Sequence, residues 1–305
     1  MFDRKGYGRA DVPLRLRWPI GSHDALSLFM PAFVRTPDAE AFALKIVSLF
    51  PGNPGRGIAY IQAAVLVLEP DIGRAKGVLE GSMLTAIRTG AAGGAAVDLL
   101  SRPESRVLAL FGAGAQGRTQ LEAACTVRPF RTVWIFDPVA AQARKLAVES
   151  AGIGPIPRDL RVASSPSEAI AEADVICTAT TSRTPVFSDR DLQLGVHVSA
   201  VGSYTPEMQE IPGETVKRAR VVVDSRSTAL AETGVLIQPI RAGMFGEDHI
   251  AAELGEVVLG REPGRRSADE ITVFKSVGIA AQDAVAASIA MDNAGRLGIG
   301  QEVVF

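Results

Sequence analysis

A glycine-rich segment that follows an apolar run constrains this chain more than any other feature. Val107–Phe111 has the length and composition of a buried parallel strand, and the sequence Gly-Ala-Gly-Ala-Gln-Gly follows it at 112–117. The next residues, to about Val127, have a helical pattern. A GxGxxG motif between a strand and a helix is typical of dinucleotide-binding domains, in which the helix N-terminus faces the phosphates. The motif therefore predicts a Rossmann-type domain.

The residues of this segment have distinct expected roles in binding a dinucleotide. Gly112 is expected to form the tight turn, Gly114 to let the pyrophosphate approach the backbone, and Gly117 to pack the helix closely on the strand. Ala115 and Gln116 open the helix beside the phosphates. The alternative is a strand–helix turn without a cofactor, and the joint occurrence of strand, loop, helix and a following acidic residue disfavours it.

The acidic residue bears on the choice of dinucleotide. Asp137 ends the next predicted strand, Thr132–Phe136, where a carboxylate can hold the hydroxyls of the adenine ribose. This carboxylate would repel a 2′-phosphate, and the following Pro138-Val139-Ala140 offers no cation. We therefore favour NAD as the cofactor, while NADP stays open.

Strands and helices alternate regularly after Pro103-Glu104, which predicts a parallel sheet with right-handed crossovers. Before this point the pattern differs, with strand-like pieces at Val12–Trp18 and Ile58–Val67 and a small-residue helix at Leu84–Leu100. A similar Ala-rich helix, from Gly278 to about Arg296, could pack against it and return the C-terminus to the first domain. Further strands are expected in the second part of the chain, at Val175–Ala179, His197–Val201 and Ala219–Val223.

Composition excludes several classes of protein. The 305 residues are 47% hydrophobic with a net charge of −2, so no basic surface for nucleic acid or a membrane is expected. Cys125 and Cys177 lie in apolar runs and are expected to be reduced and buried. The three histidines have no metal-ligand spacing, and His197 is expected to be a satisfied core residue. No signal peptide and no apolar run of about 20 residues is visible, so a cytoplasmic protein is expected.

The chain as a whole resembles the ornithine cyclodeaminase/mu-crystallin family, because short motifs occur in the family order from about residue 12 to the end. The motifs are Met30-Pro31-Ala32, Leu44–Val47, Thr85–Ala91, the Gly-Ala-Gly-Ala-Gln loop, Ala179–Ser182 with Pro185, Gly202-Ser203 with Pro206 and Glu210, and Val273–Gly278 with Asp283.

This resemblance implies an α/β enzyme in which a Rossmann-type doubly wound parallel sheet, residues 104–280, is inserted into a smaller α+β domain. The smaller domain, residues 1–103 and 281–305, would bind the substrate and form a homodimer. The family's enzymes transfer hydride between NAD(P) and the α-carbon of a small amino or imino acid. The residues that would lie at strand ends near the nicotinamide are Thr180, Val201, Gly202 and Ser276.

A substrate of this class carries a carboxylate, which is bound best by buried cations. Arg88 lies in a run of small residues and Lys45 in Ala-Leu-Lys-Ile-Val, both unusual places for surface charges. By resemblance, Lys45, Arg88 and an N-terminal arginine surround the carboxylate, and Lys45 could act as an acid/base. This arginine near the N-terminus is expected to be Arg15, although Arg17 competes for the role. The alternatives are a strand lysine that reaches solvent and a helix-surface arginine.

The chain departs from the cyclodeaminases at two places. By resemblance, cyclodeaminases have an aspartate two residues after the glycine that corresponds to Gly202, and this chain has Tyr204 there. They also have an acidic residue just before the Met-Pro pair, where this chain has Leu28-Phe29. A diamino substrate would leave its terminal ammonium unpaired. We therefore expect an imino-acid reductase or amino-acid dehydrogenase. Ornithine cyclodeaminase and a non-catalytic dinucleotide or ligand binder remain alternatives. Glu207 and Glu210 are interpreted as a solvated loop face.

Overall fold

The computed structural model describes residues 9–303, which form two compact units. One unit runs to Arg88 and resumes at Ile279, and the other comprises Thr89–Gly278. The division lies within helix α1 (Gly81–Leu100), whereas the predicted break follows that helix. No helix in the described part of the chain is long and apolar enough to cross a membrane.

The glycines of α1 explain why its second half belongs to the second unit. A Cβ atom added at Gly90 would lie 2.8 Å from the backbone oxygen of Thr119, and one at Gly94 would lie 3.1 Å from Ala123. Side chains at these positions would push the two helices apart, so small residues allow α1 to pack closely on α2 (Ala115–Val127).

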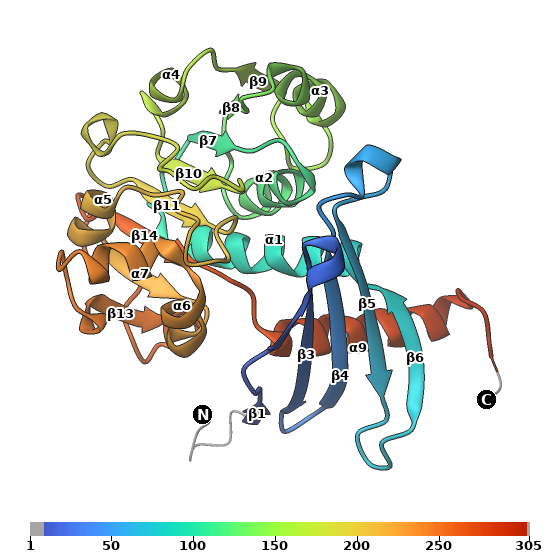
Figure 1. The fold of residues 1–305 in the computed structure, drawn as a ribbon. Helices are drawn as coiled ribbons and strands as arrows, with labels where there is room; N and C mark the ends of the chain where they lie inside the picture. Colours follow the sequence, from blue (N-terminus) through green and yellow to red (C-terminus); the bar gives the residue numbers. More distant parts are fainter. Residues whose placement is uncertain (1–8, 304–305) are drawn as a thin grey trace. The chain divides into compact units, whose positions relative to one another are not determined.

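The second unit is built on an eight-stranded parallel sheet (Figure 1). The strands that follow the glycine turn run outward in both directions from β7, in the order β9-β8-β7-β10-β11-β14-β12-β13. The chain therefore reverses direction across the sheet between β7 and β10, and ligands of such sheets bind at that point. The predicted doubly wound parallel sheet is confirmed. Its strands are β7 Val107–Phe111, β8 Thr132–Phe136, β9 Asp159–Val162, β10 Val175–Thr178, β11 His197–Ala200, β12 Arg220–Val223, β13 Ile250–Glu253 and β14 Thr272–Lys275.

Helices and fully buried apolar strand residues complete this unit. Leu108, Leu110, Val175 and Ile176 have no exposed surface, as expected for strands covered on both faces. The remaining helices of the unit are α3 Ala140–Ser150, α4 Pro166–Ile170, α5 Gly213–Arg218, α6 Arg226–Glu232, α7 Gly234–Arg241 and α8 Leu254–Val258.

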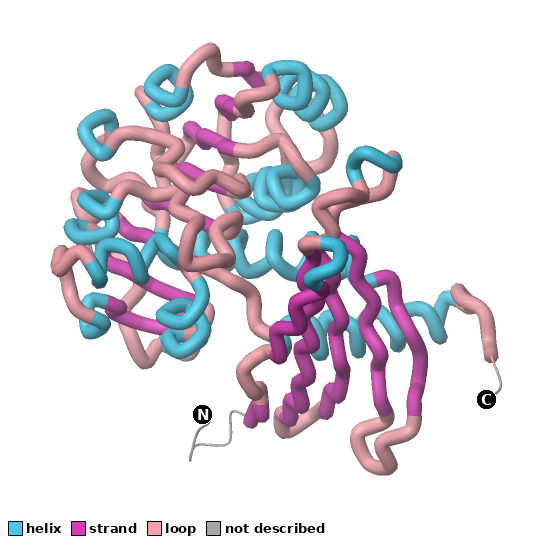
Figure 2. Tube along the Cα trace, viewed as in Figure 1, coloured by secondary structure: helices cyan, strands magenta, loops and turns pink. Residues whose placement is uncertain are grey.

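The first unit is an antiparallel sheet with one long helix on one face (Figure 2). Strands β3, β4, β5 and β6 pair in sequence, and β1 and β2 both pair with β3. Helix α9 crosses β3, β4 and β5. Its bounds and those of the strands are β1 Arg9–Asp11, β2 Leu16–Ile20, β3 Ala25–Arg35, β4 Glu40–Leu49, β5 Ile61–Leu68, β6 Ala75–Glu80 and α9 Ala280–Leu297.

The strand expected at Val12–Trp18 is displaced in the structure. Residues 12–15 are irregular, and β2 begins only at Leu16. Pro13 has no backbone N–H to donate to a neighbouring strand, which accounts for the late start.

Candidate active site

The glycine turn after β7 has the geometry that a diphosphate requires. Gly112 has a φ of +95°, which side chains other than hydrogen rarely allow. A Cβ at Gly117 would lie 1.9 Å from the Gly112 carbonyl oxygen, whereas nothing lies within 4 Å of a Cβ at Gly114. Helix α2 starts after Gly114 without a side-chain cap, and a cavity of about 290 Å³ opens beside Gly114 and Ala115. The residues present therefore fit a dinucleotide phosphate.

Asp137 lies where a ribose-binding carboxylate is expected, after β8. One of its oxygens accepts a hydrogen bond of 2.9 Å from the Ala113 amide, and the other accepts one of 2.8 Å from the Val139 amide. These bonds tie the half-buried carboxylate to the glycine turn. Pro138, Val139 and Ala140 are exposed and uncharged.

The predicted residues at the other strand ends meet at the same carboxyl edge of the sheet. Thr180 follows β10, and its methyl group would be 3.3 Å from a Cβ at Gly112. Val201 and Gly202 follow β11, and Gly202 lies so close to Thr180 that a Cβ there would be 2.1 Å from the Thr180 carbonyl oxygen. Ser276 follows β14 and donates its amide N–H to Ala200 at 3.0 Å.

A second group of predicted residues lies in the first unit. Lys45 on β4 and Arg88 on α1 are 1% and 8% exposed, and both contact Asp283 on α9. Lys45 Nζ lies 2.8 Å from Asp283 Oδ1 and 2.7 Å from Oδ2, and Arg88 Nε donates to Oδ1 at 2.9 Å. Arg88 Nη1 also donates to Gln282 Oε1 at 3.0 Å. The alternatives considered from the sequence, a strand lysine that reaches solvent and an arginine on a helix surface, are therefore wrong for Lys45 and Arg88.

Burial changes the acidity of this cluster. Burial, followed by the charge of Arg88, lowers the pKa of Lys45 to about 7, although Asp283 opposes the shift. Arg15 lies close enough to lower this pKa as well, and its Nη1 donates to the sulfur of Met30 at 4.0 Å. Met30 pairs with Lys45 across β3 and β4, which favours Arg15 over the exposed Arg17. Two basic side chains, Lys45 and Arg88, thus contact one carboxylate, and the charge of a third, Arg15, acts on Lys45.

Three functional candidates were missed or misread from the sequence. Asp283 was noted only as part of a motif, although a carboxylate in the first turn of an Ala-rich helix is itself a signal. Glu210 was interpreted as a solvated loop residue, and this is wrong, because it is fully buried and bonded to two strand ends. Asp224 was not considered, and it holds Ser276 through a hydrogen bond of 2.7 Å.

The two cysteines and His197 of the second unit are buried core residues. Cys125 and Cys177 are free and buried, and burial raises the pKa of each to about 12. His197 is fully buried, with Nδ1 2.9 Å from the Thr272 hydroxyl, while its Nε2 has no hydrogen-bond partner among the described residues.

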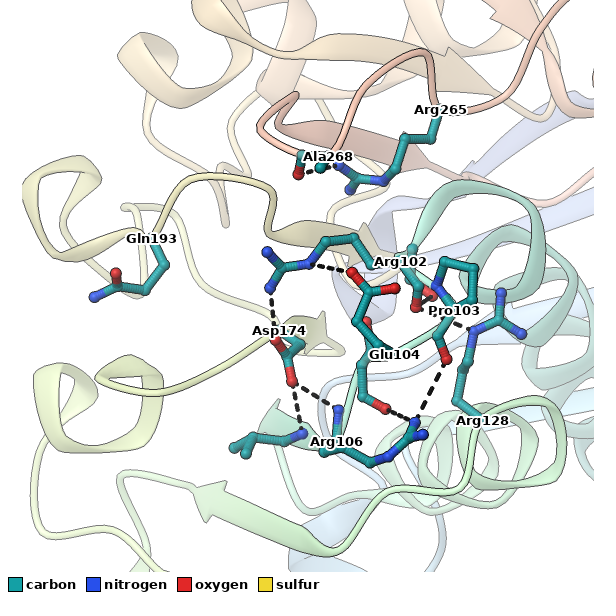
Figure 3. A network of polar contacts seen from close by, with 12 residues as sticks. Arg102, Pro103, Glu104, Arg106, Arg128, Asp174, Gln193, Arg265 and Ala268 are labelled. Carbon is teal, nitrogen blue, oxygen red and sulfur yellow. Dashed lines mark hydrogen bonds and ion pairs between the residues drawn. The ribbon is translucent and has the colours of Figure 1, made fainter.

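A polar network occupies the amino edge of the parallel sheet (Figure 3). Asp174, just before β10, accepts hydrogen bonds from Arg102 Nη2 at 2.6 Å and from the amides of Arg106 and Val107 at 2.7 and 3.0 Å. These bonds connect the starts of two strands, far along the sheet from the glycine turn.

Comparison with known proteins agrees with this geometry. The model of the ornithine cyclodeaminase/mu-crystallin family matches residues 1–296. The chain belongs to this family. The predicted resemblance is thereby confirmed over nearly the whole chain.

Individual members of the family are similar over most of their length. A Δ1-pyrroline-2-carboxylate reductase of Bacillus cereus is 38% identical over 301 residues, which cover 97% of this chain and 90% of that protein. The Thermococcus litoralis Δ1-pyrroline-2-carboxylate reductase in complex with NADH and L-proline has a TM-score of 0.92 and 38% identity, with 96% and 90% of the two chains covered. An archaeal alanine dehydrogenase dimer with bound NAD has a TM-score of 0.89 and 32% identity, with 97% and 89% covered.

Proposed function

We propose that this family member is an NAD-dependent reductase of a small cyclic imino acid such as Δ1-pyrroline-2-carboxylate, which it converts to the amino acid L-proline. The buried cluster of Lys45, Arg88 and Asp283 is the observation that carries the proposal. Relatives that are 38% identical are reductases of this imino acid, and one of them was solved with NADH and L-proline.

The cationic cluster supplies binding and a proton. Arg88 and Arg15 bind the substrate carboxylate, since a guanidinium can donate two parallel hydrogen bonds to it. Lys45, whose pKa is about 7, protonates the imine nitrogen, and Asp283 holds the ammonium in place. NADH, when bound, supplies the hydride that adds to the imine carbon. The C=N double bond thereby becomes a C–N single bond, with one new C–H bond and one new N–H bond, and the product is the amino acid.

The substrate's ring is expected to carry no charge. Leu28 lies on the same face of the antiparallel sheet as Lys45, and Tyr204 follows β11, where a cyclodeaminase would have carboxylates. Neither position offers an acidic partner for a terminal ammonium, which disfavours ornithine. An uncharged imine ring does not have this cost.

NAD is proposed as the cofactor in preference to NADP. Asp137 is held by the amides of Ala113 and Val139, so its carboxylate cannot turn away from the ribose without losing both bonds. A 2′-phosphate at this place would meet a fixed negative charge.

We also propose a homodimer formed through the sheet face of the first unit that α9 does not cover. Cross-strand pairs place a continuous row on this face: Pro31, Leu44, Leu66 and Val78. Leu16 and Val78, at its margins, are 54% and 67% exposed. An apolar face of this kind is typical of a protein interface, and the archaeal alanine dehydrogenase is a dimer. The cytoplasmic location stays a prediction from the sequence.

The test is turnover of defined substrates. With NADH and Δ1-pyrroline-2-carboxylate, the reduced-nicotinamide absorbance should fall and proline should form in equal amount. Pyruvate with ammonia tests the dehydrogenase reading, and ornithine with NAD tests the cyclodeaminase. Ornithine conversion to proline and ammonia without net NADH would overturn our assignment.

A variant separates catalysis from simple binding. Arg88→Ala should lose turnover and keep its affinity for NADH, since Arg88 is expected to bind the substrate and not the coenzyme. If the wild-type protein binds NADH and turns over none of the keto or imino acids, the non-catalytic binder is supported instead.

A further inference from the structure

Glu210 joins two strand ends at the carboxyl edge of the parallel sheet. Its Oε1 accepts hydrogen bonds from the Thr180 amide at 2.6 Å and from the Thr180 hydroxyl at 2.9 Å. Its Oε2 accepts bonds from the amides of Gly202 and Ser203 at 2.8 and 2.9 Å. Four donors therefore converge on one side chain that has no exposed surface.

Only a carboxylate can serve these four donors together. All four groups donate hydrogen, so the receiving side chain needs two oxygens with two acceptor positions each. Hydrogen bonds to an ionised acceptor are also stronger than those to a neutral one. Gly202 contributes to the same arrangement, because a Cβ there would lie 2.5 Å from Glu210 Oε1.

Asp224, at the end of β12, fixes the next strand end in the same manner. Its Oδ2 accepts hydrogen bonds from the Ser276 hydroxyl at 2.7 Å and from the amides of Val277 and Gly278 at 3.0 and 2.7 Å. Its Oδ1 accepts from the Ser225 amide at 2.9 Å. The segment that follows β14 is thus held to the end of β12.

Lys275 is the cation between these two carboxylates. It is fully buried, and Nζ donates to the carbonyl oxygens of Ala200 at 3.2 Å and Ser276 at 2.8 Å. Burial lowers the pKa of Lys275 to about 8, while the charges of Glu210 and Asp224 oppose the shift.

We propose that Glu210 and Asp224 are positioning residues, which hold Thr180, Gly202 and Ser276 in the arrangement that accepts the nicotinamide half of the coenzyme. The inference rests on the proposed function, since these three residues are expected to border the nicotinamide. Neither carboxylate takes part in the reaction. Each acts through the backbone and hydroxyl groups that it fixes.

The test compares affinities for the whole coenzyme and for ADP-ribose. ADP-ribose contains the adenosine, the diphosphate and the second ribose of NADH and lacks only the nicotinamide ring. In Glu210→Gln, an amide nitrogen must face N–H donors at one of the two strand ends. We expect NADH to bind at least about tenfold more weakly in this variant, and ADP-ribose to bind within about twofold of the wild type, by calorimetry.

Asp174→Asn is the matched control. Asp174 accepts three hydrogen bonds where Glu210 accepts four, two of the three come from backbone amides, and Asp174 lies at the opposite edge of the same sheet. We expect Asp174→Asn to have an unfolding temperature as far below that of the wild type as Glu210→Gln has. Its ratio of NADH affinity to ADP-ribose affinity should equal that of the wild type. A merely structural role of Glu210 would give the same result in both variants.

Glu210→Asp serves if the glutamine variant does not fold, because it keeps the charge beside Lys275 but is too short to reach both strand ends. It should show the same selective loss of NADH affinity. Equal NADH affinity in wild type and folded Glu210 variants overturns the inference alone. A wild-type protein that binds neither NADH nor ADP-ribose overturns the proposed function.

Discussion

Burial disfavours the charged form of a lysine, and at Lys45 the carboxylate of Asp283 opposes this effect. Asp283 contacts the Lys45 ammonium through both oxygens and raises the pKa of Lys45, while the charges of Arg88 and Arg15 lower it. The resulting pKa of about 7 leaves Lys45 able to gain or lose a proton near neutral pH. This is the property that an acid in imine reduction needs.

The first prediction concerns the pH dependence of turnover. If protonated Lys45 is the proton donor, kcat/KM for imine reduction should be level below pH 7 and fall as the pH rises above about 7. Oxidation of the amino acid needs neutral Lys45 and should show the opposite trend. Steady-state rates in both directions over this range measure it, and a flat reductive profile would count against Lys45 as the donor.

A second prediction follows from the role of Asp283. Its charge raises the pKa of Lys45, so Asp283→Asn should lower that pKa further and move the decline in reduction to lower pH. Removing one partner of a buried ion pair also costs about 3–5 kcal/mol of stability. The pH profile and a thermal unfolding curve of the variant check both effects. An unchanged profile in a folded variant would refute the coupling.

At the scale of single elements, the glycine turn offers a matched pair of substitutions. Gly117→Ala places a methyl group 1.9 Å from the Gly112 carbonyl oxygen, so the unfolding temperature should fall. Gly114→Ala meets no atom within 4 Å, and its φ of −82° suits alanine. This second variant should keep its stability and bind NADH at least about tenfold more weakly, because the methyl group occupies the diphosphate's path. Unchanged NADH affinity in Gly114→Ala would contradict a diphosphate at this turn.

The sequence predicted local elements better than it predicted their partners. The turn at 112–117, the strand before it and the helix after it follow from composition and spacing within about 20 residues. The contact of Lys45 with Asp283 joins residues on two elements far apart in the chain, and no periodicity reports it. Glu210 was misread because loop residues are usually solvated, and only the folded strand ends reveal its four donors.

At the scale of the whole molecule, the sheet of the first unit determines the expected assembly. Alternation along β3 to β6 places Lys45 on the face under α9 and Leu44 on the other face. The uncovered face carries aromatic and aliphatic side chains in register across four strands. Exposure of this apolar area to water is unfavourable, and packing against a second copy would bury it.

The prediction at this scale is a monomer in Leu44→Glu. A charge in the middle of the uncovered face should prevent two copies from packing there. Val148→Glu, at a position on α3 that is 82% exposed, is the control and should remain dimeric. Light scattering during gel filtration gives both masses. A wild-type protein that is monomeric at micromolar concentration would contradict the homodimer.

The most direct test of the account follows the hydride itself. NADH that carries deuterium at the transferable position is mixed with Δ1-pyrroline-2-carboxylate, and the product is analysed by mass spectrometry and NMR. We predict L-proline with one deuterium on the α-carbon for each NADH consumed, and no such product from Lys45→Met. Proline without deuterium, or no consumption of NADH by a protein that binds it, would contradict the reductase.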